Sequence, residues 1–348
     1  MERTRDLAVG AALAIFAAAS PASAQSVADF YKGKQIEFLV TGDAGTQNDK
    51  WARLLARHVP KFMPGNPTFV VKTMPGGGHI IGANYLYNNA AKDGTVIGIT
   101  SRNVPTTALL SNPAVKYDVT KFQWLASSDF PSRICVVRPD APVQKGEDLF
   151  EKELTVAGAG AGSTVSTTPT ILSAVLGMKF KLIEGYKSPP EAILAVERKE
   201  VDGMCLSLGG IDQLRPGFMT EGKLKVLFNL ERNPIKGFPG VDAPSIHKFI
   251  KTDEQRQIIV FYSANVELGR PMFTPPGVPA DRVAALEKAF GEALRDPAVI
   301  ADAKREKLDY APLTGAELKE RVDSFMATPK SVIDRTIELV GAASVSGG

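Results

Sequence analysis

The chain of 348 residues is 44% hydrophobic and carries a net charge of only +3. This apolar fraction supports well-filled hydrophobic cores, and the length suits two domains of ordinary size. Basic residues are interspersed with acidic ones, so we expect no nucleic-acid partner. The many Ala, Gly and Val residues are typical of an α/β protein.

The first residues resemble an export signal. Two arginines precede an apolar, alanine-rich run at 7–19, and a small-residue cleavage site follows at 22–24. A membrane anchor is the alternative, but the run is shorter than the roughly 20 residues that span a bilayer. We therefore expect a signal peptide over residues 1–24, cleaved near Ala24, and a periplasmic mature protein.

Strand-like and helix-like stretches alternate from residue 35 onward. Apolar strands are predicted at 36–40, 69–71 and 96–100, with helices between them at 49–59 and 80–91. This βαβαβ order with short connections implies a parallel sheet with right-handed crossovers.

A second α/β unit follows the first. Its predicted elements are strands at 134–137, 154–157, 180–183, 204–208 and 224–230, with helices at 168–176 and 189–199. The chain from residue 281 onward is predicted to be mainly helical, and helices without strands of their own must pack on an existing sheet. We expect residues 25–130 and 265–348 to form lobe 1 and residues 131–264 to form lobe 2.

Three glycine-rich turns, at 41–49, 75–82 and 157–164, each follow an apolar run and precede a helical one. Such a turn exposes backbone N–H groups at a helix N-terminus, where anions bind. Ligands of open parallel sheets bind at the carboxyl ends of the strands, so two facing lobes would place these turns across one cleft. The pattern predicts a protein that holds a small anion.

Motifs for other activities are missing from the sequence. It contains no phosphate-binding G-x-x-x-x-G-K-[ST], no G-x-G-x-x-G, no H-E-x-x-H and no G-x-S-x-G. We expect no cofactor, no metal and no catalytic residue. The alternative is an exported α/β hydrolase, but neither Ser101 nor Ser163 has a histidine in its own motif.

Several polar residues of the turns have two interpretations. Asp49 either caps a helix or orders the first turn around a ligand. Ser163 and Thr164 either cap a helix or bind an anion. Arg102 leaves a strand at the predicted cleft, and its forked guanidinium suits a carboxylate unless solvent surrounds it. Arg133 lies nearer the predicted hinge and is a weaker candidate.

Two cysteines, Cys135 and Cys205, lie in apolar runs. They either pair in an oxidising compartment or remain two small buried apolar side chains. In both cases we expect them on neighbouring strands of the second lobe.

Seven segments resemble motifs of one known family, in the family's order. They are 46–53 (a glycine turn with D-x-x-A-R), 74–84 (P-G-A-G-G-x-x-G-A), 92–95 (P-D-G-Y-T), 159–163 (A-T-G-x-G-S), 186–188 (Y-K-G), 200–202 (G-Q-V-D) and 275–279 (A-P-A-G-T-P). The family is the Bug/TctC receptors, the extracytoplasmic solute-binding proteins of tripartite tricarboxylate transporters.

The resemblance implies a two-lobed type II periplasmic binding protein fold, each lobe a mainly parallel sheet flanked by helices. It also implies a monomer that closes on a small organic acid and delivers it to the membrane subunits of the transporter. The acid is a mono- or dicarboxylate, aromatic acids included. Asp43 stands where the family has an aromatic residue, and this acidic group makes a polyanion such as citrate a poorer ligand.

Family members hold the carboxylate largely with backbone N–H groups of the glycine turns in both lobes. Together with the polar residues above, this gives one set of candidate ligand-binding residues. They are Gly42, Ala44, Gly45, Thr46, Asp49, Gly78, His79, Arg102, Gly160, Gly162, Ser163, Thr164, Tyr186 and Asp202.

Overall fold

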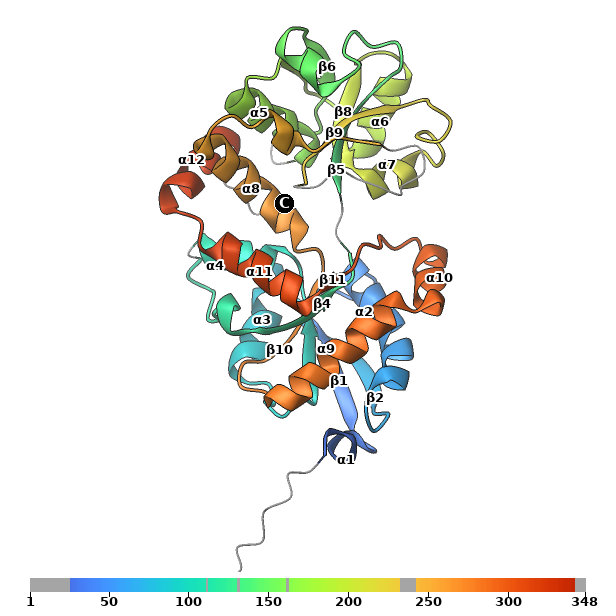
Figure 1. The fold of residues 1–348 in the computed structure, drawn as a ribbon, viewed down its shortest axis with the longest axis vertical. Coiled ribbons are helices and arrows are strands. Elements are labelled where there is room, and N and C mark those ends of the chain that lie inside the picture. The colour runs from blue at the N-terminus through green and yellow to red at the C-terminus, as the bar shows by residue number, and fades with distance from the viewer. Residues whose placement is uncertain (1–25, 111, 130–131, 161–162, 232–241, 342–348) are drawn as a thin grey trace, which may run out of the picture.

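The computed structural model describes residues 26–110, 112–129, 132–160, 163–231 and 242–341. The predicted signal peptide lies outside these residues. The described chain forms two separate sheets, and the helices flank both of them in an elongated, two-lobed molecule (Figure 1).

Among the described residues, the first sheet consists of β1 (Gln35–Val40), β2 (Thr68–Thr73), β3 (Val96–Ile99), β4 (Gln123–Ser127), β10 (Pro271–Thr274) and β11 (Leu313–Thr314). Their spatial order is β11-β4-β10-β3-β1-β2. β1 runs parallel to β2 and β3. β10 runs antiparallel to β3 and β4, and β11 antiparallel to β4.

The second sheet consists, in the described chain, of β5 (Arg133–Val137), β6 (Leu154–Ala157), β7 (Phe180–Ile183), β8 (Gly203–Ser207) and β9 (Lys225–Asn229). Their order is β7-β6-β8-β5-β9. β6 runs parallel to β7 and β8, whereas β5 runs antiparallel to β8 and β9.

The two sheets confirm the predicted α/β, two-lobed fold class, but each sheet is mixed rather than mainly parallel. The antiparallel pairs involve β4, β10 and β11 in the first sheet and β5 in the second. The first sheet is mixed because β4 and β10 lie on either side of the passage to the second lobe. One leads the chain out of the sheet and the other leads it back (Figure 1).

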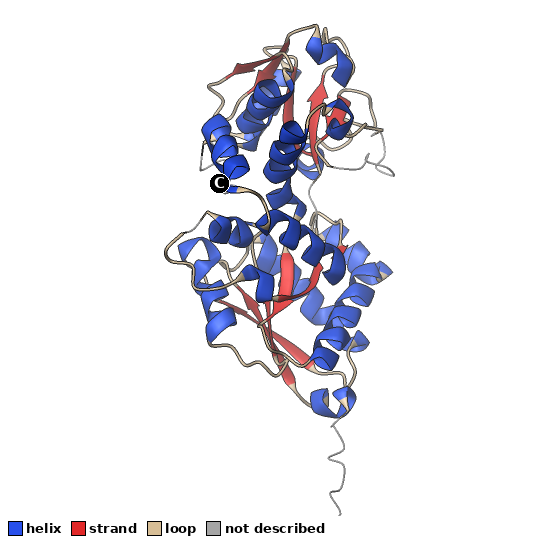
Figure 2. Ribbon diagram, turned by 60° about the vertical axis from the view of Figure 1, so that its left-hand side comes forward, coloured by secondary structure: helices blue, strands red, loops and turns tan. Residues whose placement is uncertain are grey.

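Helices cover both sheets, and loops join them (Figure 2). The α-helices are α1 (Val27–Tyr31), α2 (Gln47–His58), α3 (Ile80–Asn88), α4 (Asn103–Leu109), α5 (Thr164–Leu176), α6 (Pro189–Glu197), α7 (Leu208–Leu214), α8 (Asp253–Glu267), α9 (Ala280–Arg295), α10 (Pro297–Arg305), α11 (Gly315–Met326) and α12 (Lys330–Val340). The 3-10 helices are η1 (Val59–Phe62), η2 (Gly77–His79), η3 (Val119–Lys121), η4 (Gly146–Phe150) and η5 (Ile246–Phe249).

The core of the first lobe forms where α2 and α9 pack on the sheet. Trp51 and Leu55 recur at helical spacing on α2 and are fully buried, together with Phe38 of β1 and Phe290 of α9. Phe38 is in edge-to-face contact with Phe290, with ring centroids 5.7 Å apart. This packing fixes the ends of β1 and α2, and therefore the turn between them.

The C-terminal helices divide between the lobes. α9 and α11 contact β4 of the first sheet, whereas α12 contacts α5 and α8. Val332 and Ile333 of α12 belong to the buried cluster around Cys135 and Cys205. The lobe boundaries, with 265–348 wholly in lobe 1, therefore remain a prediction.

The two cysteines lie on neighbouring strands of the second sheet, as predicted. Cys135 of β5 is directly opposite Cys205 of β8, and a disulfide joins them. The open question of pairing is thus settled in favour of a bond.

Two of the segments between the lobes are held side by side. The Ser127 hydroxyl donates to the carbonyl oxygens of Asp129 and Leu268, at 3.1 and 3.0 Å. Gly269, at φ +61°, lies so close to the Asp129 carbonyl that a Cβ would meet its oxygen. This contact brings the chain leaving β4 against the chain entering β10.

None of the described helices has the length and apolar character of a membrane span.

Candidate functional site

The first glycine turn is ordered by Asp49. Its carboxylate accepts the Gly45 N–H at 2.8 Å and pairs with the Arg53 guanidinium at 2.9 Å. The residue is 3% exposed. Thr46, and not Asp49, caps α2, because its side chain accepts the Asp49 N–H. Asp49 therefore shapes the turn from within.

These contacts stabilise the ionised form of the Asp49 carboxylate. Burial alone would raise the pKa of Asp49, but hydrogen bonds from Arg53 and Gly45 outweigh it and lower the pKa below its usual value. The carboxylate is thus ionised at neutral pH and holds the Gly45 N–H. Ala44 and Gly45 are themselves exposed at the tip of the turn.

The second glycine turn contacts the first through His79. Its Nδ1 lies 3.0 Å from the Thr41 hydroxyl, which in turn lies 2.7 Å from the Thr100 hydroxyl. A Cβ on Gly42 would lie 2.7 Å from His79 Cε1, so only glycine leaves room for the ring. The exposed Gly78 precedes it at φ +61°.

His79 is neutral at neutral pH. Burial lowers the pKa of His79, and the negative charge of Asp43 only partly offsets this. A neutral imidazole beside two hydroxyl groups can donate or accept hydrogen bonds but carries no charge. The Thr41 hydroxyl is fully buried, so this pair does not present an accessible nucleophile.

The third glycine turn leads into α5. Ser163 caps this helix by accepting the Val165 N–H at 3.3 Å, and Thr164 begins it. The Gly160 N–H donates to the Glu184 carboxylate at 3.1 Å. Gly162 lies outside the described residues. The turn is thus confirmed at the start of a helix, where backbone N–H groups attract anions.

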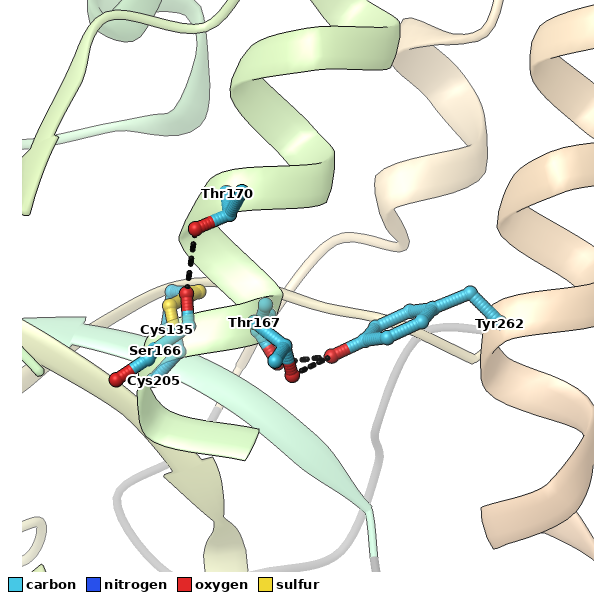
Figure 3. The surroundings of a disulfide bond; sticks show 7 residues. Cys135, Ser166, Thr167, Thr170, Cys205 and Tyr262 are labelled. Atoms are coloured by element: carbon cyan, nitrogen blue, oxygen red, sulfur yellow. Dashed lines mark hydrogen bonds between the residues drawn. A yellow bond between two sulfur atoms is a disulfide. The ribbon is translucent and has the colours of Figure 1, made fainter. Parts of the chain in front are cut away.

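The first turn of α5 is tied to α8 by Tyr262. The Tyr262 hydroxyl lies 2.8 Å from the Thr167 hydroxyl and 3.0 Å from that of Thr168. Figure 3 shows Tyr262 pointing toward Thr167 near the disulfide. The guanidinium carbon of Arg133 lies 5.0 Å from the centroid of the Tyr262 ring, a cation–π contact. The contacts therefore connect the third glycine turn with Arg133.

Arg102 lies next to the same region. It follows β3 directly before α4, and α4 contacts η2, which carries His79. Burial, and secondarily the positive charge of Arg133, lowers the pKa of Arg102 to about 10. Arg102 remains a cation at neutral pH. Sequence reasoning ranked Arg133 lower because of its place near the hinge. In the structure Arg133 contacts Tyr262 of α8, and α8 contacts α4, at whose start Arg102 lies.

Two predicted site residues are engaged elsewhere. Asp202 precedes β8, at the end of the strand opposite Ser207, and pairs with Arg138 at 2.9 Å. It also accepts the Thr155 hydroxyl at 2.6 Å. The Tyr186 hydroxyl donates to Glu200 at 3.2 Å. Neither contact involves a glycine turn.

The described residues hold no group of three or more His, Cys, Asp or Glu side chains that could bind a metal ion. The Ser163 hydroxyl is engaged with a backbone N–H of its own helix. The arrangement consists of helix starts, hydroxyl groups and two guanidinium groups, which suits binding of an anion.

Solved structures share this fold. A crystal structure of a TctC solute binding protein from Polaromonas is similar over 88% of this chain and 99% of its own, with 21% identity and a TM-score of 0.68. The R. palustris protein Rpa4515, with adipate, is similar over 88% of this chain and 97% of its own, with 17% identity and a TM-score of 0.50.

These likenesses show a two-lobed α/β fold. Residues 52–333 match the model of the tripartite tricarboxylate transporter family receptor. The chain belongs to this family, as its motifs predicted. A search of curated protein sequences finds no match to it.

Proposed function

We propose that the protein is a periplasmic receptor that captures a small organic carboxylate between its lobes and delivers it to the membrane subunits of a tripartite tricarboxylate transporter. It binds the acid without transforming it and acts as a monomer without a cofactor. Residues 25–130 and the returning chain from 265 to 326 form one lobe of the cleft, and residues 131–264, against which α12 packs, form the other. The signal peptide, residues 1–24, directs export.

The observation that carries this proposal is the contact path between the two lobes. It runs from the start of α5 to Tyr262 on α8, from α8 to α4, at whose start Arg102 lies, and from α4 to η2, which carries His79. Donor groups that favour a negative charge lie along it. A carboxylate bound here contacts the glycine turns of both lobes and stabilises their approach. The family's name and the adipate of Rpa4515 agree with an organic acid as ligand.

The set of ligand-contacting residues is narrower than the sequence suggested. We retain Gly42, His79, Arg102, Ser163 and Thr164, together with Gly162 from the sequence. Gly160 is left out because its N–H donates to Glu184. Asp49 acts by holding the first turn. Asp202 and Tyr186 are left out because their polar groups are engaged with Arg138, Thr155 and Glu200.

A thermal-shift screen of carboxylic acids tests the proposal. At 100 times its Kd a ligand stabilises the folded protein by about 2.7 kcal/mol. Analysis of the recovered acid must show it unchanged, since a changed product would favour a hydrolase. Small-angle scattering should show compaction with the best acid. If no acid shifts the melting temperature, the proposal fails.

A further inference from the structure

Three arginines gather where the chain passes between the lobes. Arg102 follows β3, Arg133 is the first residue of β5, and Arg270 directly precedes β10. The paired crossing segments, joined by Ser127, and the pairing of β10 with β3 bring Arg270 close to the end of β3. Arg133 contacts Tyr262 of α8, and α8 contacts α4, at whose start Arg102 lies. The Thr100 N–H, two residues before Arg102, donates to the Pro271 carbonyl at 3.0 Å.

Only one of these three guanidinium groups has a carboxylate partner among the described residues. Arg270 forms an ion pair with Asp129. Arg133 is 6% exposed, and its Nη1 is buried without a hydrogen-bond partner. Arg102 is half-buried and has no hydrogen bond or ion pair in the described part of the chain.

The neighbouring acids do not neutralise this pair. Glu231 accepts the backbone N–H of Arg133 at 2.7 Å, but burial raises the pKa of Glu231 to about 8, so it is mostly uncharged at neutral pH. Asp309 attracts both Arg102 and Arg270 from a distance. Arg102 and Arg133 therefore have no direct carboxylate partner among the described residues, although the carboxylate of Asp309 lies near enough to attract Arg102.

A buried guanidinium without a partner is costly, and two of them repel each other. An anion that binds both removes the repulsion and supplies charge-assisted hydrogen bonds. The aromatic ring of Tyr262 beneath Arg133 orients its fork, and Thr167 and Thr168 hold that ring. The pair is thus a fixed receptor for an anionic group.

We propose that Arg102 and Arg133 form a second anion subsite, which holds an acidic group of the ligand other than the carboxylate on the glycine turns. The two residues thereby select a dicarboxylate over a monocarboxylate. This inference rests on the proposed function as a carboxylate receptor, and it narrows the ligand class of that site. Arg102 comes from the first sheet and Arg133 from the second, so the bound group also links the lobes.

Calorimetry with matched acids tests the subsite. Succinate, glutarate and adipate are compared with butyrate, pentanoate and hexanoate, which have the same carbon chains and one carboxylate fewer. Since a hydrogen bond to a charged group contributes about 1.5–3 kcal/mol, we expect the best dicarboxylate to bind the wild type about 10- to 150-fold more tightly than its monocarboxylate.

Substitutions locate the effect. Arg102→Met and Arg133→Met retain the side-chain stem and remove the charge. Each should abolish most of the preference for the dicarboxylate, because dicarboxylate affinity should fall at least about 10-fold more than monocarboxylate affinity. Arg133→Lys keeps a charge without the fork and should keep part of the preference. Arg198→Met, whose side chain is 69% exposed, removes the same charge from the surface and should have no effect.

The outcomes of these measurements either support or overturn the second subsite. Equal binding of mono- and dicarboxylates, or a preference that survives in Arg102→Met, overturns the subsite and leaves the receptor proposal intact. Failure of every acid to bind overturns both. If Arg133→Met does not fold because Arg133 is buried, Arg102→Met still tests the subsite, because Arg102 is only half-buried.

Discussion

Cys135 and Cys205 face each other across the antiparallel strands β5 and β8, with their Cα atoms 4.1 Å apart and their sulfur atoms joined. Each is 1% exposed, and both lie in the buried cluster that α5, α8 and α12 cover. The bond joins positions 70 residues apart. A crosslink over a segment of this length restricts the unfolded chain and stabilises the folded one.

Removal of the disulfide should therefore weaken the second lobe. We expect the double variant Cys135→Ala/Cys205→Ala to lose about 2–4 kcal/mol of unfolding free energy. Alanine is chosen because it introduces no buried hydroxyl group. Urea denaturation followed by circular dichroism measures the change, and reduced wild type should behave like the variant. An unchanged midpoint in both would show that the bond adds no stability.

Asp49 offers a second test, of the first glycine turn. Asp49→Ala removes the acceptor of the Gly45 N–H, and water replaces it at this exposed turn, so we expect a loss of about 0.5–1.5 kcal/mol of stability. It should also weaken binding of the best acid from the screen. Because the pKa of Asp49 is lowered, its stabilising effect is present above the unfolded pKa and is lost as the pH falls.

The matched control for Asp49 is its ion-pair partner. Arg53→Met removes the pair, but the Arg53 side chain is 51% exposed and the Gly45 hydrogen bond remains. An exposed pair contributes about 0–1 kcal/mol. Calorimetry should therefore show a smaller loss of affinity than in Asp49→Ala. Equal losses would mean that the charge of Arg53, rather than the order of the turn, matters.

The sequence predicted the strands that carry the glycine turns, because each is a compact apolar run followed by glycine. It did not reveal β4, β10 or the helix α8. β10 is four residues long, begins with Pro271 and is fully buried, so it shows no alternation that would distinguish it. Because β4 and β10 make the antiparallel pairs of their sheet, missing them led to the expectation of mainly parallel sheets.

Prediction of the site was limited in a similar way. Residues within the turns were identified because a glycine turn before a helix has a local pattern. The role that we propose for Arg133 depends on Tyr262 and Arg102, which are far away in the sequence, so no local pattern could indicate it. Asp202 was included on its motif alone, and its pairing with Arg138 depends on strand register.

Gly42 tests the contact between the first two turns. Gly42→Ala would place a Cβ 2.7 Å from His79 Cε1, so the ring must move although the Thr41 hydroxyl holds it at 3.0 Å. Forced displacement of this kind costs about 1–3 kcal/mol. Acid binding should weaken in calorimetry while the protein remains folded.

The control for Gly42 is Gly291→Ala on α9, where a Cβ meets only Arg295 at 3.5 Å. An alanine within a helix is favourable, so this variant should be as stable as wild type or more so, with unchanged affinity. If Gly42→Ala binds as the control does, the His79 ring is not held in place for the ligand.

Glu231 makes the stability of the protein depend on pH. It is 8% exposed, and burial raises its pKa from 4.5 to about 8. Between these values the folded protein holds a proton that the unfolded chain has released, so stability falls as the pH rises, by up to about 1.4 kcal/mol per pH unit.

The variant Glu231→Gln tests this, because its side chain still accepts the Arg133 N–H but cannot ionise. We expect it to be more stable than wild type at and above neutral pH, with a flatter slope, in urea denaturation over this pH window. Glu320→Gln, at an exposed position on α11, should keep the wild-type slope. A Glu231→Gln profile parallel to that of wild type would show that Glu231 does not hold the proton.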